Sequence, residues 1–96
     1  MLDSKQRSYL KSLASELHDT IYIGKEGITQ GVIKQLANEL QANELVKGKV
    51  LDSSLLSIKE AAEQLALQTN SQVVYTIGKK FVLYKENKEK ARINLP

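Results

Sequence analysis

Two segments near the C-terminal end are apolar at consecutive positions, and they constrain the fold more than any other feature. They are Gln72–Ile77 and Phe81–Lys85, separated by the short basic connection Gly78-Lys79-Lys80. Side chains alternate between the two faces of a strand, so strands with Val, Ile, Leu, Phe or Tyr at both alternations need cover on both faces of the sheet. The pattern predicts a hairpin buried on both sides, whose cover the rest of the chain must supply.

Three segments have the apolar spacing of amphipathic helices and can supply that cover. We expect the first over about residues 4–18, the second from Thr29 to Asn43 and the third from Ser57 to Asn70. Their apolar faces are Leu10, Leu13, Ala14 and Leu17 in the first, Ile33, Leu36, Ala37 and Leu40 in the second, and Ile58, Ala61, Ala62 and Leu65 in the third.

The ends of these helices carry signals of their own. Asp3 or Ser4 can cap the first helix, and Thr29 the second. Ser57 and Glu60 fit a capping box at the third. We expect His18 to end the first helix near its terminal carbonyls, and Asn43 and Asn70 to end the other two, Asn43 in the left-handed conformation.

Two further strands are expected between the helices, at Thr20–Ile23 and Glu44–Leu51. In the second of them, Lys47 and Lys49 should point to one face and Val46 and Val50 to the other. The element order is then α-β-α-β-α-β-β. It predicts an α/β protein with a four-stranded mixed sheet packed by three helices.

Composition excludes several kinds of site. The chain has 96 residues, which fits one small domain, with no Cys and one His. Without Cys we expect no disulfide, no thiolate metal site and no Cys nucleophile. With a single His we expect neither the usual zinc sites nor the usual catalytic triads. No apolar run approaches a membrane span and the N-terminus does not resemble a signal peptide, so we expect a cytoplasmic protein without cofactor, metal or membrane partner.

The net charge of +3 is concentrated at one end of the sequence. Residues 79–96 contain six Lys or Arg and two Glu, so the whole excess falls there. This asymmetry favours an anionic partner such as a nucleic acid. A solubilising C-terminal segment would produce the same pattern, and residues 86–96 could be a loose tail or a short docked segment.

The stretch Gly24-Lys25-Glu26-Gly27 joins an expected strand to an expected helix. Glycines allow a sharp turn and a close approach of the backbone to a ligand, and the N–H groups of a helix start attract phosphate. The spacing is not that of a Walker loop, so it indicates contact with a backbone phosphate rather than nucleotide hydrolysis. A turn without any ligand has the same pattern.

Other candidate residues are basic or aromatic and lie on the expected strands. The basic set could form one positive strip if its strands are neighbours, or could simply protect strand edges; it consists of Lys47, Lys49, Lys79, Lys80 and Lys85. Tyr22, Tyr75 and Tyr84 could stack on unpaired bases, but their apolar neighbours favour buried or half-buried places. Carboxylates such as Glu60 and Glu63 lie on a polar helix face, and we expect no enzyme site.

Three separated blocks resemble the CRM domain, named for chloroplast RNA splicing and ribosome maturation, in its bacterial single-domain YhbY-like form. The blocks are Ile23–Thr29, Glu44–Val50 and Val74–Lys85, and the resemblance extends to the closing Lys90–Pro96. It implies an RNA-binding domain over residues 1–85, followed by a basic tail over 86–96. The implied fold is similar to the C-terminal domain of translation initiation factor three.

The resemblance also implies a partner and site residues. Bacterial single-domain members are associated with precursors of the large ribosomal subunit, and their glycine loop, here Gly24–Gly27, is taken to contact RNA. Basic positions carry over to Lys79 and Lys85. Two positions depart from the family pattern: Asp19 stands where Pro is frequent, and Lys85 stands where Arg is common, without Arg's planar bidentate contact to phosphate.

Together, residues and resemblance predict a protein that grips structured ribosomal RNA by charge and shape, as an assembly factor of the large subunit. The predicted contacts are Gly24, Lys25, Glu26, Gly27, Lys47, Lys49, Lys79, Lys80 and Lys85. One alternative is a ribosome-associated protein-interaction module that does not itself recognise RNA. Another is a small-molecule enzyme that uses the glycine loop as a phosphate cradle, which would lack acid–base partners.

Overall fold

The computed structural model describes residues 2–89, 91 and 93–96. Within this part of the chain the elements are α1 (Ser4–Ala14), β1 (Ile21–Ile23), α2 (Gln30–Asn43), β2 (Leu45–Val50), α3 (Ile58–Thr69), β3 (Gln72–Ile77) and β4 (Lys80–Tyr84). The α/β class and the order α-β-α-β-α-β-β expected from the sequence are confirmed.

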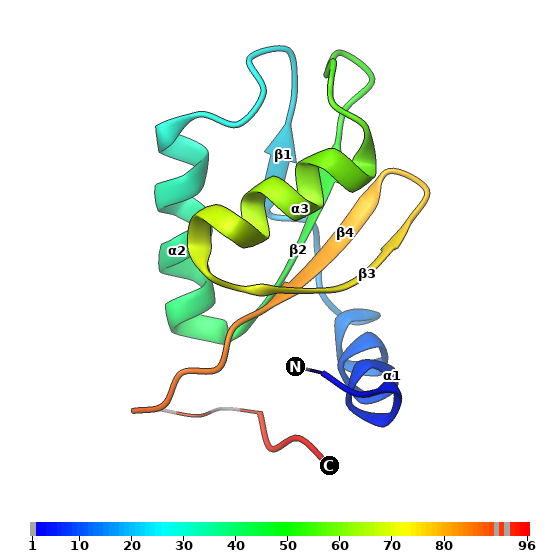
Figure 1. Cartoon of the computed structure of the whole chain (residues 1–96), viewed down its shortest axis with the longest axis vertical. Coiled ribbons are helices and arrows are strands. Elements are labelled where there is room, and N and C mark those ends of the chain that lie inside the picture. Colours follow the sequence, from blue (N-terminus) through cyan, green and yellow to red (C-terminus); the bar gives the residue numbers. More distant parts are fainter. Residues whose placement is uncertain (1, 90, 92) are drawn as a thin grey trace.

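The strands form one mixed sheet in the order β1-β2-β4-β3. β1 and β2 are parallel, which α2 makes possible as a crossover, and β4 is antiparallel to both β2 and β3. The parallel strands therefore end where β4 begins. Figure 1 shows that the loop after β1, the loop after β2 and the β3–β4 turn all lie at this end of the sheet.

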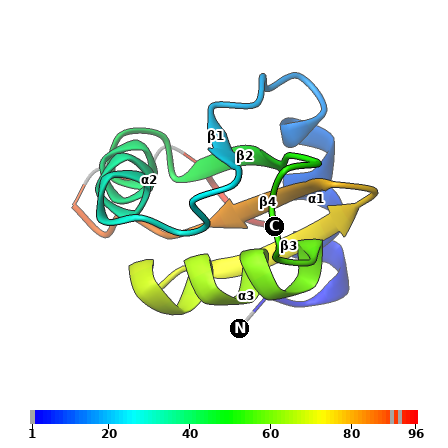
Figure 2. The ribbon, with the colours of Figure 1, turned by 90° about the horizontal axis from the view of Figure 1, so that it is seen from above.

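Both faces of the sheet are covered, as the doubly apolar hairpin requires. On one face, Phe81 and Leu83 of β4 pack with α2 and α3. On the other face, Val82 and Tyr84 pack with Leu10 and Ala14 of α1 and with other buried residues. Figure 2, which looks down on the loops, shows α3 along β3 and β4 and α2 beside β1. The sheet is thus the middle layer of a sandwich, with a helix pair on one side and a single helix on the other.

The helix starts follow the predicted capping signals. The Asp3 side chain accepts the Gln6 N–H, and the Thr29 hydroxyl oxygen accepts the Val32 N–H. In the predicted capping box, Ser57 Oγ accepts the Glu60 N–H and Glu60 Oε1 accepts the Ser57 N–H, both at 3.1 Å. The hydrogen bond from the Ser57 backbone N–H, and then the Ser57 side chain, lower the pKa of Glu60.

The end of α1 differs from the prediction. The helix ends at Ala14 rather than at residue 18. It is followed by a tighter turn, in which the Glu16 N–H donates to the Leu13 carbonyl and the Leu17 N–H donates to the Ala14 carbonyl. Residues beyond Ser15 instead lead the chain across to β1. His18 therefore lies outside the helix, exposed, and the prediction that it ends α1 is wrong.

The end of α2 also differs from the prediction by one residue. Asn43 is the last helical residue, and the positive φ of 66° belongs to Glu44. Glu44 is fully buried: its N–H donates to Leu40, its carbonyl accepts the Lys85 N–H, and its carboxylate accepts the N–H groups of Asn87 and Ile93 at 2.7 and 2.8 Å. These bonds fix the turn at Glu44, which the sequence pattern alone does not indicate. At the end of α3, Asn70 is left-handed as predicted.

The described part of the C-terminal segment is docked rather than loose. Ile93 and Leu95 pack against the cluster on the α1 face of the sheet. Lys90 and Arg92, which contribute to the predicted basic end, lie outside the described residues. No helix in the described ranges has the length and apolar character needed to cross a membrane.

Candidate nucleic-acid interface

The loop after β1 is a tight turn closed by its two glycines. The Gly27 N–H donates to the Gly24 carbonyl at 3.0 Å, so Lys25 and Glu26 occupy the tip, where both are exposed. Gly27 has a φ of +70°, in the left-handed region that favours glycine. The turn therefore presents an exposed cation on a hydrogen-bonded backbone turn.

Gly24 brings this turn against the loop between β2 and α3. The Leu51 N–H donates to the Ile23 carbonyl at 2.8 Å, and a Cβ added at Gly24 would lie 3.4 Å from Ser53 Oγ. This is an ordinary van der Waals distance, so the two loops lie side by side in normal contact (Figure 1). The start of α2 follows directly, and its partial positive charge lies beside the turn.

Two of the predicted lysines meet across the sheet near this end. Lys49 of β2 is opposite Lys80 of β4, and Lys47 lies two residues earlier on the same face of β2. Val46 and Val50 point to the other face, into the core with α2 and α3, as predicted. Since β2 and β4 are neighbours, the structure satisfies the condition on which a shared basic strip depends.

The lysines at the β3–β4 turn are held by carboxylates from neighbouring segments. Lys79 forms an ion pair with Asp52 of the loop after β2, and the Lys79 carbonyl accepts the Val50 N–H. Lys80 Nζ lies 3.3 Å from Asp19, which precedes β1. These pairs are at least partly exposed, so each stabilises the fold little and leaves its ammonium group within reach of a phosphate.

Lys85 is separated from the other predicted site residues. It follows the last residue of β4, so the length of that strand, roughly 15 Å, lies between it and the β3–β4 turn. Its Nζ donates to the Thr69 carbonyl at 3.1 Å. A cation there satisfies an end carbonyl of α3. The structure therefore brings the loop, Lys49, Lys79 and Lys80 to one end, leaves Lys47 opposite Val82 in the middle of the sheet, and places Lys85 at the other end.

The three strand tyrosines have different environments. Tyr84 is buried, and burial, then the nearby carboxylates of Glu44 and Glu86, raise the pKa of its hydroxyl. Tyr75 is half-buried with Lys11 Nζ 5.3 Å from its ring centre. Tyr22 is 50% exposed, so the expectation of a buried or half-buried place is wrong for this residue. The sequence shows that Ile21 and Ile23 flank it, but not that α1 leaves the opposite face of β1 uncovered.

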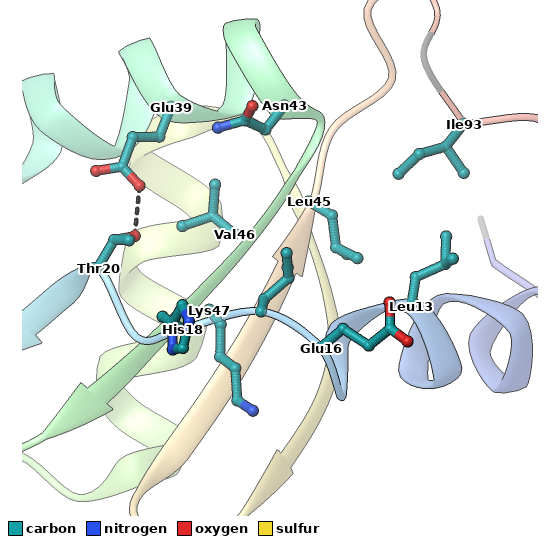
Figure 3. Close-up of a pocket in the computed structure, with 11 residues that line it drawn as sticks. Leu13, Glu16, His18, Thr20, Glu39, Asn43, Leu45, Val46, Lys47 and Ile93 are labelled. Atoms are coloured by element: carbon teal, nitrogen blue, oxygen red, sulfur yellow. Dashed lines mark hydrogen bonds between the residues drawn. The ribbon is translucent and has the colours of Figure 1, made fainter.

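A groove of about 550 Å³ lies below this end, between α1, the segment before β1, α2, β2 and Ile93 (Figure 3). Leu45 and Val46 line it together with Glu16, His18 and Lys47. Glu39 also lines it and accepts a hydrogen bond from the Thr20 hydroxyl. Its mixed charges do not favour an anion. In the described ranges no three His, Cys, Asp or Glu side chains gather as metal ligands would.

Comparison with known proteins shows which family the chain belongs to. The relative named "Probable RNA-binding protein YqeI" from Bacillus subtilis is 43% identical over the full length of both chains. A protein of Haemophilus influenzae named "RNA-binding protein" is 35% identical, covering 99% of this chain and 95% of its own. The solution structure of SAV1595 from Staphylococcus aureus matches over the full length of both chains, with a TM-score of 0.79 and 41% identity. The CRS1 / YhbY (CRM) domain matches residues 2–85, and the chain belongs to this family.

Proposed function

We propose that this protein binds RNA through the end of the sheet that carries the Gly24–Gly27 turn, and that its RNA is ribosomal RNA in precursors of the large ribosomal subunit. The names of its relatives support RNA as the ligand. The resemblance to bacterial single-domain members supports the ribosomal target. The chain acts in this proposal as an assembly factor rather than as an enzyme.

One observation carries the RNA-binding proposal: the three loops at one end of the sheet hold the glycine turn and the basic residues together. Lys79 is paired with Asp52, whose loop contacts Gly24, and Lys80 lies opposite Lys49. A phosphate backbone that follows this end meets cations from segments more than fifty residues apart in sequence. Neutralising its phosphates releases counterions and supplies affinity without base-specific contacts.

Within this surface Lys25 is a cation at an exposed turn that is well placed for a phosphate. Among the residues that the structure describes, no carboxylate oxygen lies within 4 Å of its ammonium group, whereas Lys79 and Lys80 each have an acidic partner. The adjacent backbone, kept narrow by Gly24 and Gly27, allows a sugar–phosphate chain to approach. Lys25 can therefore bind a phosphate without breaking an ion pair within the protein.

Replacing Lys25 with Ala tests this assignment. We expect weaker binding to structured ribosomal RNA, with the slope of log K against log salt smaller by about one, because one phosphate contact is lost. Stability should change by less than about 0.5 kcal/mol, since the side chain is exposed. Lys5→Ala removes the same charge from an exposed residue of α1, away from the Gly24–Gly27 turn, and is the control. Equal affinity of wild type and Lys25→Ala at low salt would contradict the proposal.

Sedimentation of gently lysed cells tests the ribosomal target. The wild-type protein should move with precursors of the large subunit, and a variant with both Lys25→Ala and Lys79→Ala should remain at the top of the sucrose gradient. If both remain at the top in low salt, the ribosomal target is wrong. If both sediment alike, other residues carry the association.

A further inference from the structure

One row of side chains crosses the whole sheet just below the Gly24–Gly27 turn. Tyr22 of β1 is opposite Lys49 of β2, Lys49 is opposite Lys80 of β4, and Lys80 is opposite Ile77 of β3. Directly opposed residues of neighbouring strands point to the same face, so these four side chains lie side by side. Alternation places them on the α1 face, together with Val82 and Tyr84.

The helix that covers this face does not reach the row. α1 packs over Leu45, Val82 and Tyr84, toward the other end of the strands. Tyr22 is 50% exposed and Ile77 is 61% exposed, although both belong to strands. The row, Tyr22-Lys49-Lys80-Ile77, is therefore an open strip of sheet with an aromatic residue at one end, an aliphatic residue at the other and two cations between them.

The Tyr22 ring is held in a fixed orientation. Its hydroxyl donates to the Asp19 carbonyl at 3.0 Å, and the Asp19 carboxylate in turn lies 3.3 Å from Lys80 Nζ. An exposed aromatic ring without such a bond would lose side-chain entropy when a ligand orders it. Tyr22 has already lost much of this freedom, so its ring is prepared to receive a planar partner.

We infer that this row binds an unpaired nucleotide of the RNA, with the base stacked on Tyr22 and the flanking phosphates on Lys49 and Lys80. The inference rests on the proposed function and specifies which part of the RNA lies on the sheet. Stacking on an aromatic ring beside a cationic groove is how sheets hold single-stranded nucleic acid. The charges favour this occupant over a protein helix, because two lysines interrupt the apolar surface that such a helix would need.

The consequence for ligand choice is specific. A base inside a duplex is stacked on its neighbours and cannot lie on Tyr22, whereas a base in a loop or bulge can. The lysines of the loops contact phosphates, which duplex RNA and unpaired RNA both present. The protein should therefore bind an RNA hairpin with an unpaired loop more tightly than a fully paired duplex of equal length, and Tyr22 should supply the difference.

The test measures affinity for these two RNAs by fluorescence anisotropy with four variants. Tyr22→Leu should weaken binding to the looped hairpin by about 5- to 150-fold and leave duplex binding unchanged. Tyr22→Phe, which keeps the ring and loses the hydroxyl bond, should retain most of the affinity. Ile77→Ser, at the other end of the row, should weaken hairpin binding less. Tyr9→Leu, a half-exposed tyrosine on α1, is the matched control and should change neither affinity.

The outcomes separate this inference from the proposed function. If wild type binds neither RNA, the proposed function is wrong. If wild type binds both and Tyr22→Leu, folded by its unfolding midpoint, binds the hairpin as well as wild type, RNA binding stands and the stacking inference is overturned. Equal losses for hairpin and duplex would also overturn it, because a duplex offers no free base. Should Tyr22→Leu fail to fold, unchanged hairpin affinity of Ile77→Ser would overturn it instead.

Discussion

Gly48 shows at the residue scale how one position depends on its neighbours in the sheet. It lies between Ile21 of β1 and Phe81 of β4. A Cβ there would lie 2.7 Å from the Ile21 carbonyl oxygen and would collide with the Phe81 ring, which fills the space over the glycine. The missing side chain at Gly48 leaves the space that the ring of Phe81, the largest fully buried side chain, occupies.

Gly48→Ala should therefore lower the free energy of unfolding by about 1–3 kcal/mol, because backbone and ring must both shift. Urea denaturation measures the change. Gly31→Ala is the matched control: Gly31 is helical and exposed, an added Cβ there has only an ordinary 3.8 Å contact, and Ala should raise stability by roughly 0.5 kcal/mol. Equal effects at the two sites would contradict the packing at Gly48.

Residue patterns in the sequence predicted some placements correctly and others not. The alternation in β2 correctly placed Lys47 and Lys49 opposite Val46 and Val50. The same reasoning failed for Tyr22, because alternation tells which residues share a face but not how far a covering helix extends. Exposure is decided by packing, and α1 is too short and too distant along the strands to cover β1.

At the element scale, the start of α3 depends on the charge of Glu60. Its carboxylate accepts the Ser57 N–H, and its pKa is lowered from 4.5 by that bond. A lowered folded pKa means that the stabilisation is present above the unfolded value and is lost as the pH falls through the folded value. The capping box is therefore complete at neutral pH and weakens in acid.

Glu60→Gln tests this pH dependence. Gln can still accept the Ser57 N–H but does not titrate, so the difference in unfolding free energy between wild type and variant should shrink or reverse as the pH falls below about 4.5. Thermal unfolding at a series of pH values measures it. Glu63→Gln, on the exposed face of the same helix, is the control; a pH-independent difference for Glu60→Gln would contradict the assignment.

At the scale of the whole molecule, Glu44 connects α2, β2 and described residues of the C-terminal segment. It is fully buried where α2 turns into β2, and its carboxylate holds the backbone of Asn87 and Ile93, while Ile93 and Leu95 pack on the α1 face. Asn87, Ile93 and Leu95 are thereby part of the fold, and the two apolar residues pack in the cluster beneath α1.

Glu44→Gln should loosen this segment. Gln replaces one accepting oxygen with an NH₂ group that cannot accept the N–H bonds, so the free energy of unfolding should fall by about 1.5–3 kcal/mol, as expected for hydrogen bonds to a charged group. Hydrogen exchange at the Asn87 and Ile93 amides should accelerate more than in the core strands. Exchange at wild-type rates would show that other contacts hold the segment.

Local patterns in the sequence were sufficient to predict the elements and their order. Helical periodicity, three capping signals and a doubly apolar hairpin are local patterns. Because each depends on residues close together in sequence, each can be recognised without knowing the fold. Together with strand count they also indicated a sheet covered on both faces. The glycine turn and its two exposed tip residues were likewise visible as a local pattern.

Which of these segments come into contact depends on the packing of the whole chain. Strand pairing places Lys49 beside Lys80, while Lys85 lies at the opposite end of β4. The buried Glu44 forms the turn that ends α2, and its carboxylate binds the backbone of Asn87. The reach of α1 decides that Tyr22 and Ile77 are open. These outcomes depend on contacts between segments distant in sequence, whose geometry follows from the packing of the whole core and is not encoded in any one stretch of the chain.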